Sequence, residues 1–213
     1  MTPFPIPSHH RALIYDKPGT GGLGHLALQM GARGMGFRMI VSCQLRDPDM
    51  NTDEDKALDF GDKADFAAEC GAEAYIDLSK YESESQPLAA EVKKRTPNGL
   101  GAAAVLVCTA ANEAYAQALS LLRFNGMLIC IGVPEGKPVP IATAFPATLI
   151  AQELQIVGSV VGNRADATET MQMAARGLVK TRVAIQPMDS LMDVFQKMNS
   201  RTLTGRVVLD LTV

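Results

Sequence analysis

One glycine-rich stretch decides the fold: Tyr15-Asp-Lys-Pro-Gly19-Thr-Gly21-Gly22-Leu-Gly24-His-Leu-Ala-Leu-Gln-Met30. Gly19, Gly21 and Gly24 stand at G-x-G-x-x-G spacing, with an apolar run before them and a helical pattern after them. A strand, a tight turn and a helix in that order are the context that a dinucleotide-binding fingerprint requires. The glycines permit a sharp turn, close approach of a pyrophosphate and close packing of the helix on the strand. The helix N-terminus then offers free N–H groups and a positive dipole end to phosphates.

Strand-like and helix-like segments alternate through the rest of the chain. Strands are expected at 12–15, 38–41, 74–77, 103–108, 127–131, 153–159 and 206–210, and helices at 22–33, 63–70, 88–95, 112–122, 166–176 and from 190. This alternation predicts an α/β fold, a Rossmann-type doubly wound parallel sheet, in a single domain over residues 11–213. Residues 1–10, which carry three prolines, are expected to form a disordered tail. Asp166-Ala-Thr-Glu169 is expected to be a capping box at the start of helix 166–176.

Bulk composition narrows the class of protein. The chain has 213 residues, a formal net charge of −3 and no basic patch, which argues against a nucleic-acid or anionic-membrane partner. No apolar run approaches membrane-spanning length, and the N-terminus does not read as a secretory signal. The four cysteines form no C-x-x-C pair, so neither a zinc cluster nor a disulfide framework is indicated. We expect a cytoplasmic protein.

Two other kinds of site find little support. His9 and His10 are adjacent, and adjacent residues rarely converge on one metal ion without further ligands, so we expect no metal site there. A short-chain dehydrogenase would need a Tyr-x-x-x-Lys pair on one helix face. None of the four tyrosines is followed by a lysine at that spacing; the residues found there are Gly19, Ser79, Ser85 and Leu119.

Several longer strings stand in one order along the chain: Gly19-Thr-Gly-Gly-Leu-Gly-His25, Cys70-Gly-Ala-Glu-Ala-Tyr-Ile-Asp77, Leu122-Arg-Phe-Asn-Gly126, Ile131-Gly-Val-Pro134, Gly158-Ser-Val-Val-Gly-Asn-Arg164, Ala175-Arg-Gly-Leu-Val-Lys180 and Gly205-Arg-Val-Val-Leu-Asp210. With these strings the chain resembles the cofactor-binding half of zinc-type, medium-chain alcohol dehydrogenases, closest to the yeast and fungal type. The resemblance extends from about residue 11 to the C-terminus, and the strings at 158–164 and 175–180 are the most specific.

The resemblance implies an NAD site. By this resemblance, the pyrophosphate is held by Gly21, Gly22 and Leu23, beside Gly19 and Gly24 of the fingerprint. Arg206 reaches the same group. Thr109 lies beside the adenosine, and Ile131, Ser159 and Val161 present backbone groups to the nicotinamide. For three of these residues a purely structural role, without a contact to the cofactor, remains open. Ile131 and Val161 are apolar and would be buried in any such fold, and Arg206 could be a surface cation beside a strand.

Asp59 is the candidate for binding the ribose. Dinucleotide folds place a carboxylate about 20 residues after the glycines, and Asp59 lies well beyond that distance from Gly24. Residues 41–56 show no helical or strand period, and without them Asp59 returns to that spacing with Lys63 nearby. We therefore expect 41–56 to be an exposed inserted loop. It is either a genuine insertion or a retained intron, because valine codons begin with GT and one lysine codon ends in AG, as the two ends of an intron do. The alternative is that the second strand ends in Cys43 and no carboxylate serves the ribose.

The resemblance also implies what this chain lacks. The family's other half supplies the ligands of a catalytic and a structural zinc, and zinc catalysis needs three protein ligands and an open position. We therefore expect no catalytic and no metal-binding residue here, and the enzymatic activity stays open. The expected partners are NAD(H) and either further copies of the chain or full-length family subunits, paired through the family's sheet edge. The alternatives are a non-catalytic nucleotide-binding or partner module, or a truncated or mis-spliced product without function.

Overall fold

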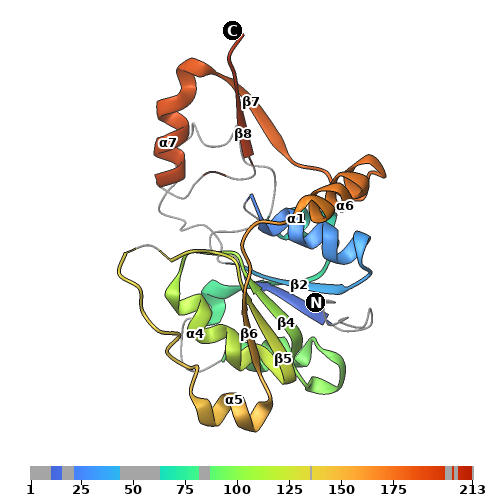
Figure 1. The fold of residues 1–213 in the computed structure, drawn as a ribbon, viewed down its shortest axis with the longest axis vertical. Coiled ribbons are helices and arrows are strands. Elements are labelled where there is room, and N and C mark those ends of the chain that lie inside the picture. The colour runs from blue at the N-terminus through green and yellow to red at the C-terminus, as the bar shows by residue number, and fades with distance from the viewer. Residues whose placement is uncertain are drawn as a thin grey trace.

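A six-stranded parallel sheet forms the centre of the molecule (Figure 1). The computed structural model describes residues 11–15, 22–43, 63–81, 87–134, 136–199, 203 and 206–212, so the expected tail 1–10 lies outside the described residues. The strands are β1 (Arg11–Tyr15), β2 (Arg38–Cys43), β3 (Ala72–Asp77), β4 (Ala102–Val107), β5 (Leu122–Cys130) and β6 (Gln155–Gly158). Their order, β3-β2-β1-β4-β5-β6, is that of a doubly wound dinucleotide-binding sheet, so the predicted fold class is confirmed.

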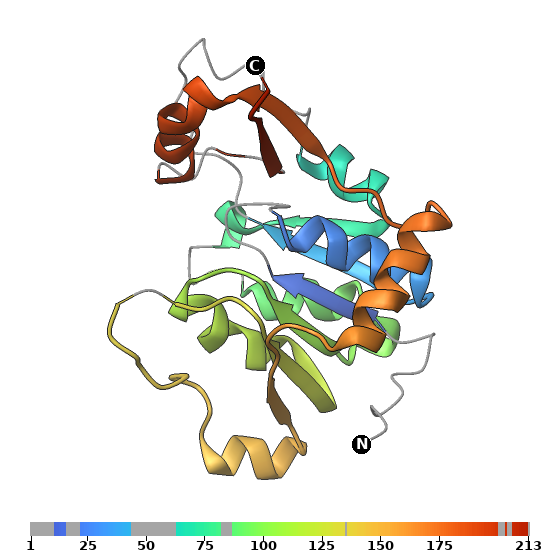
Figure 2. The ribbon, with the colours of Figure 1, turned by 45° about the horizontal axis from the view of Figure 1, so that its top comes forward.

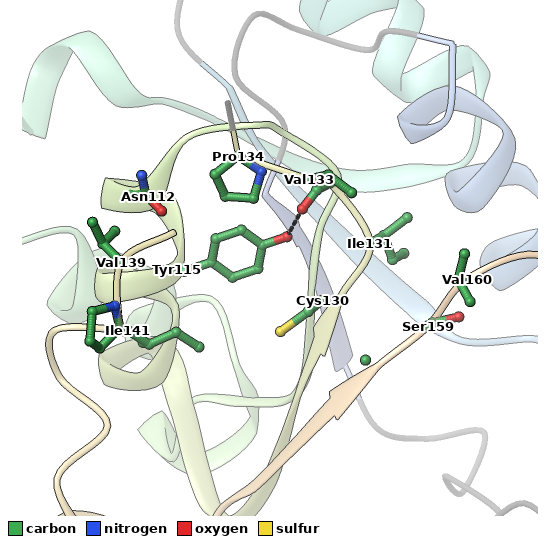
Figure 3. Close-up of a pocket in the computed structure, with 13 residues that line it drawn as sticks. Asn112, Tyr115, Cys130, Ile131, Val133, Pro134, Val139, Ile141, Ser159 and Val160 are labelled. Atoms are coloured by element: carbon green, nitrogen blue, oxygen red, sulfur yellow. Dashed lines mark hydrogen bonds between the residues drawn. The ribbon is translucent and has the colours of Figure 1, made fainter. Parts of the chain in front are cut away.

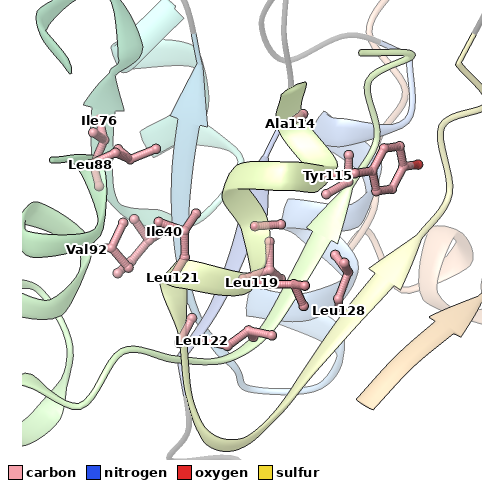
Figure 4. Packing of buried hydrophobic residues seen from close by; sticks show 14 of the residues in the cluster. Ile40, Ile76, Leu88, Val92, Ala114, Tyr115, Leu119, Leu121, Leu122 and Leu128 are labelled. Carbon is pink, nitrogen blue, oxygen red and sulfur yellow. The ribbon is translucent and has the colours of Figure 1, made fainter. Parts of the chain in front are cut away.

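Helices cover both faces of this sheet (Figure 2). They are α1 (Gly24–Gln29), α2 (Lys63–Glu69), α3 (Leu88–Lys94), α4 (Asn112–Leu121), α5 (Pro146–Gln152) and α6 (Arg164–Ala175). Short 3₁₀ turns occur at Leu78–Tyr81 and Pro97–Gly99. One core, shown in Figure 4, packs α3 and α4 against Ile40, Val105 and Leu128. The other packs α1 and α2 against Met39 and Val41, so alternate residues of one strand face opposite cores.

The first helix does not end as a regular α-helix. It continues into the π-helical segment η1 (Met30–Gly34), where the Met35 N–H donates to the Met30 carbonyl at 2.9 Å. A Cβ on Gly31 would lie 2.7 Å from the sulfur of Met39, so this glycine lets the helix pack directly on β2. The close packing that a glycine inside a helix suggests is therefore present, and the π turn places one additional residue before β2.

The second strand is longer than predicted, which corrects the start of the inserted loop. Val41 and Ser42 are fully buried in β2, and Tyr15 pairs with Ser42 on one side while Asp77 pairs with Cys43 on the other. Residues 41–56 were expected to be exposed, and that expectation is wrong for Val41 and Ser42, because β2 is paired with a parallel neighbour on each side. Residues 44–56 lie outside the described part of the chain, so the rest of the loop stays a prediction.

A second, smaller sheet follows the main one. Strands β7 (Val183–Pro187) and β8 (Arg206–Asp210) pair in parallel, and the turn η5 (Met188–Ser190) and helix α7 (Leu191–Asn199) connect them. The sequence predicts β8 and α7 correctly and misses β7. The helix before this unit, α6, begins with Asn163 as its cap and Asp166 as the reciprocal partner, so the capping box expected at Asp166–Glu169 is wrong by three positions.

Candidate dinucleotide-binding site

The sheet has one point at which its winding reverses, between β1 and β4. These strands are neighbours, with Tyr15 paired to Val107, but the chain leaving β1 enters α1 on one face and the chain leaving β4 enters α4 on the other. In open α/β sheets, ligands bind in the crevice at such a point, outside the carboxyl ends of the strands. The predicted residues that the structure describes lie after the carboxyl ends of β1, β4, β5 and β6, apart from Lys63 and Arg206.

The glycine turn is described from Gly22 onward, and Gly19 and Gly21 lie outside the described residues. Leu23 caps α1, is 50% exposed and makes no side-chain hydrogen bond to the first turn of the helix. Gly24 is buried where the helix begins. The N–H groups at the start of this helix therefore receive no side-chain cap from Leu23, which is the arrangement of an anion-binding helix start.

Arg206, the first residue of β8, lies directly beside this turn. Its Nη2 donates a hydrogen bond to the Gly22 carbonyl at 3.1 Å. A Cβ on Gly22 would lie 3.5 Å from the Arg206 Nε, so the side chain packs against the backbone of the turn. The fold thus brings together two residues that are far apart in the sequence and sets a permanent positive charge at the start of α1.

Thr109 follows β4 and is 6% exposed. The chain after β5 passes very close to it, because a Cβ on Gly132 would lie 2.2 Å from the Thr109 carbonyl oxygen. The Val107 carbonyl accepts hydrogen bonds from the N–H groups of both Ile131 (3.1 Å) and Gly132 (2.9 Å). These contacts hold the ends of β4 and β5 together at the crevice.

A pocket of about 450 Å³ opens beside Ile131 and Ser159 (Figure 3). Tyr115, Cys130, Val139 and Ile141 contribute to its mostly apolar lining. The Tyr115 hydroxyl donates to the Gly132 carbonyl, and burial of the ring raises the pKa of Tyr115 to about 12. The Ser159 N–H donates to the Cys130 carbonyl at 2.9 Å, which joins the end of β6 to β5. Two of the residues expected at the nicotinamide therefore line one pocket.

Val161 does not contribute to a core. Its side chain is 94% exposed and its φ is +30°, which is a strained conformation for a β-branched residue. The alternative reading of Val161 as a buried core residue is therefore wrong. Ile131 is half-buried in the pocket lining, so its side chain has both an interior and an accessible part.

The ribose end of the site is described only in part. Asp59 lies outside the described residues, and Lys63 is the first residue of α2. The described strand β2 runs to Cys43, and the residues between Cys43 and Lys63 lie outside the described part of the chain, so the alternative to an Asp59 site stays open. Asp77, at the end of β3, is paired with Cys43, is buried and lies 3.9 Å from the Lys80 ammonium. The role of Asp59 stays a prediction.

Among the residues that the structure describes, no group of three or more His, Cys, Asp or Glu side chains could hold a metal ion. In the same residues, no helix combines the length and the apolar character needed to cross a bilayer.

Sequence reasoning missed two residues that shape the site, Tyr115 and Gly132. In the sequence Tyr115 is only a tyrosine without a following lysine, yet it lies on the buried face of α4 and reaches the loop after β5. Gly132 belongs to the string Ile131-Gly-Val-Pro134, and a glycine directly after an apolar strand was the available signal for a close backbone approach.

Comparison with known proteins agrees with this geometry. A family model described as "Zinc-binding dehydrogenase" matches residues 22–176. Alcohol dehydrogenase 2 of Emericella nidulans is 42% identical over 194 residues, which cover 90% of this chain and 48% of that protein. The alcohol dehydrogenase of Schizosaccharomyces pombe is 35% identical over 197 residues, with 92% and 49% covered. The chain therefore spans about half the length of the curated relatives it matches.

Solved structures show the same fold. An alcohol dehydrogenase from Aeropyrum pernix superimposes with a TM-score of 0.72 at 24% identity, over 95% of this chain and 50% of that one. An alcohol dehydrogenase from Thermus sp. ATN1 gives a TM-score of 0.72 at 16% identity, over 95% and 51%. The resemblance found in the sequence is confirmed by the family model, which covers most of the chain, and by the fungal relatives. The chain belongs to the zinc-binding dehydrogenase family and corresponds to the NAD-binding half of its members.

Proposed function

We propose that this chain binds NAD(H) and represents the cofactor-binding half of an alcohol dehydrogenase, an oxidoreductase that interconverts alcohols with aldehydes or ketones. The observation that carries the proposal is the contact between Arg206 and Gly22 at the start of α1. A guanidinium there adds a fixed charge to the N–H groups of a helix start, and both favour a pyrophosphate. The fungal relatives named above, which are alcohol dehydrogenases, support the class of reaction.

The residues of the crevice suit the parts of the dinucleotide in turn. Gly22, Leu23 and Gly24 would face the pyrophosphate, with Arg206 across from them. Thr109 would lie beside the adenosine, with Asp59 and Lys63 at its ribose. Ile131, Ser159 and Val161 would face the nicotinamide, and the apolar pocket lined by the first two would keep water away from the ring, which is uncharged in NADH.

When bound, NAD supplies the acceptor for the hydride that leaves an alcohol carbon. This chain's own residues contribute binding and orientation: a charged clamp at the turn and an apolar surface near Ile131. Activation of the alcohol oxygen requires an electrophile, which zinc provides in zinc-dependent dehydrogenases through three protein ligands and one open position. The half of the relatives that this chain does not match would supply those ligands.

A second function, a partner module, rests on a different observation. Strand β6 is the last strand of the sheet, and all four of its residues are exposed, with Ile156 at 37% and Val157 at 40%. Val160, just after it, is 83% exposed. An apolar sheet edge favours pairing with another strand, so we propose that copies of this chain, or full-length family subunits, associate along β6. The unbridged thiols of Cys70 and Cys130 suit a reducing, cytoplasmic compartment.

The experiment that tests the proposal combines binding and turnover. Titration calorimetry measures NADH binding by the purified chain, and absorbance at 340 nm measures ethanol oxidation with and without added zinc. NADH binding without turnover in either condition is the expected result. Absence of NADH binding would contradict the proposal, and zinc-dependent turnover that a chelator abolishes would show that the chain does hold a zinc site.

A further inference from the structure

Gln29, the last residue of α1, makes an unusual pair of contacts far along the chain. Its side chain is 3% exposed, its Nε2 donates to the Lys180 carbonyl at 2.9 Å, and the Lys180 N–H donates to its Oε1 at 2.8 Å. The same Nε2 also donates to the His25 carbonyl at 3.1 Å, one turn earlier in α1. Both donors of this buried amide group and one of its acceptor sites are thus used, and two of the three hydrogen bonds hold the backbone at Lys180 as a strand partner would.

The backbone at Lys180 is connected to Arg206 through the pairing of β7 with β8. Val183, three residues later, begins β7 and is paired with Arg206 of β8. The Arg206 N–H also donates to the Arg182 carbonyl at 3.2 Å. Gln29 and Arg206 therefore act at the two ends of α1: Gln29 holds the segment that enters β7, and Arg206 contacts the Gly22 carbonyl at the helix start.

The small sheet depends on such anchors. A two-stranded sheet is marginally stable by itself, and β7 and β8 pair only with each other in the described part of the chain. Besides Gln29, the same segment is held by Val179, which is buried, and by Arg182, which lies 4.5 Å from the centre of the Phe66 ring and 3.5 Å from Glu69. The ion pair of Arg182 with Glu69 is partly exposed, and exposed ion pairs contribute little. The buried double hydrogen bond at Lys180 is the stronger constraint on where β7 starts.

We propose that Gln29 is a positioning residue for Arg206: by fixing Lys180 it sets the place of β7 and β8, and thereby the place of the Arg206 guanidinium above the glycine turn. Gln29 itself does not contact the dinucleotide in this account. The consequence for binding rests on the proposed function, because it assumes that Arg206 meets the pyrophosphate. The consequence for β8 does not rest on it.

The binding test is a double-mutant cycle. Gln29→Leu keeps the size of the side chain and removes its hydrogen bonds, and we expect it to weaken NADH binding about fivefold, which corresponds to a coupling of about 1 kcal/mol. In an Arg206→Ala background the same change is expected to have almost no further effect. Adenosine, which lacks the pyrophosphate, serves as the control ligand, and Gln172→Leu, an exposed glutamine on α6, serves as the control variant. Equal weakening of NADH binding in both backgrounds would overturn the proposal.

A second measurement keeps the two proposals separate. Hydrogen exchange of the β8 amides is expected to accelerate about tenfold in Gln29→Leu, without cofactor, while exchange in β4 stays as in the wild type. Unchanged exchange in β8 would overturn the positioning role whatever the wild type does with NADH. Failure of the wild type to bind NADH, together with faster exchange in β8, would refute the proposed function and retain the structural link. If Gln29→Leu does not fold, Gln29→Glu, which keeps the acceptor and loses the donor, takes its place.

Discussion

Gly132 passes so close to Thr109 that a Cβ at position 132 would lie 2.2 Å from the Thr109 carbonyl oxygen. The obstacle is backbone, which cannot turn aside as a flexible side chain can. We expect Gly132→Ala to lower the free energy of unfolding by about 1–3 kcal/mol and to separate the ends of β4 and β5. Urea unfolding measures this change.

The matched control for that substitution is Gly158→Ala in β6. A Cβ on Gly158 would meet nothing within 4 Å, so its unfolding free energy should stay within about 0.5 kcal/mol of the wild type. If both alanine variants unfold at the same urea concentration as the wild type, the close approach of Gly132 to Thr109 is not present in solution.

The hydroxyl of Tyr115 holds the same loop from the other side. Tyr115→Phe removes the donor to the Gly132 carbonyl and leaves the ring packed among buried residues, so the expected loss is about 1 kcal/mol of unfolding free energy. Thermal unfolding measures it. A variant as stable as the wild type would mean that water satisfies the carbonyl equally well.

Tyr115 also predicts a pH dependence. Its pKa is raised from 10.0 to about 12, mainly by burial, which favours the neutral phenol in the folded state. The contribution of the neutral Tyr115 phenol to the free energy of unfolding is therefore complete below pH 10 and is lost as the pH rises from about 10 to about 12. Absorbance titration of the phenolate near 295 nm should show a step at about pH 12 that Tyr115→Phe lacks. Identical titration curves for the two proteins would contradict this assignment.

Asp59 predicts the choice of cofactor. A carboxylate at the ribose accepts hydroxyl groups and repels a 2′-phosphate, so we expect NADH to bind more tightly than NADPH. Asp59→Ala should reduce this preference. Calorimetry with both cofactors measures it, and equal affinities in the wild type would favour the alternative in which β2 ends at Cys43 without a ribose carboxylate.

The sequence predicts the fold well because its strongest signals are local. Gly22 and Gly24 stand between an apolar strand and a helix pattern, and the apolar run ending in Val107 is typical of a strand buried on both faces. The structure confirms the strand order that this pattern implies. The helix α5, Pro146-Ala-Thr-Leu-Ile-Ala-Gln152, escapes prediction because its seven residues are too few to show a helical period.

The errors occur where pairing over a long distance decides the structure. Val41 was expected to begin the inserted loop and Ser42 its polar stretch, but β1 and β3 pair with them on both sides and bury them. Strand β7 is short and ends in Pro187, and among the described residues it pairs with β8 alone. The contact between Arg206 and Gly22, and the hold of Gln29 on Lys180, join residues too distant in sequence for any local pattern to show.

Titration calorimetry of NADH with the wild type and with Arg206→Ala tests the central claim most directly. Loss of a charge-assisted hydrogen bond of about 2 kcal/mol corresponds to a weakening of more than tenfold, so Arg206→Ala should bind NADH at least that much more weakly. Arg176→Ala, an exposed arginine just after α6, should bind as the wild type does. Equal NADH affinity in all three proteins would contradict the dinucleotide site described for Gly22 and Arg206.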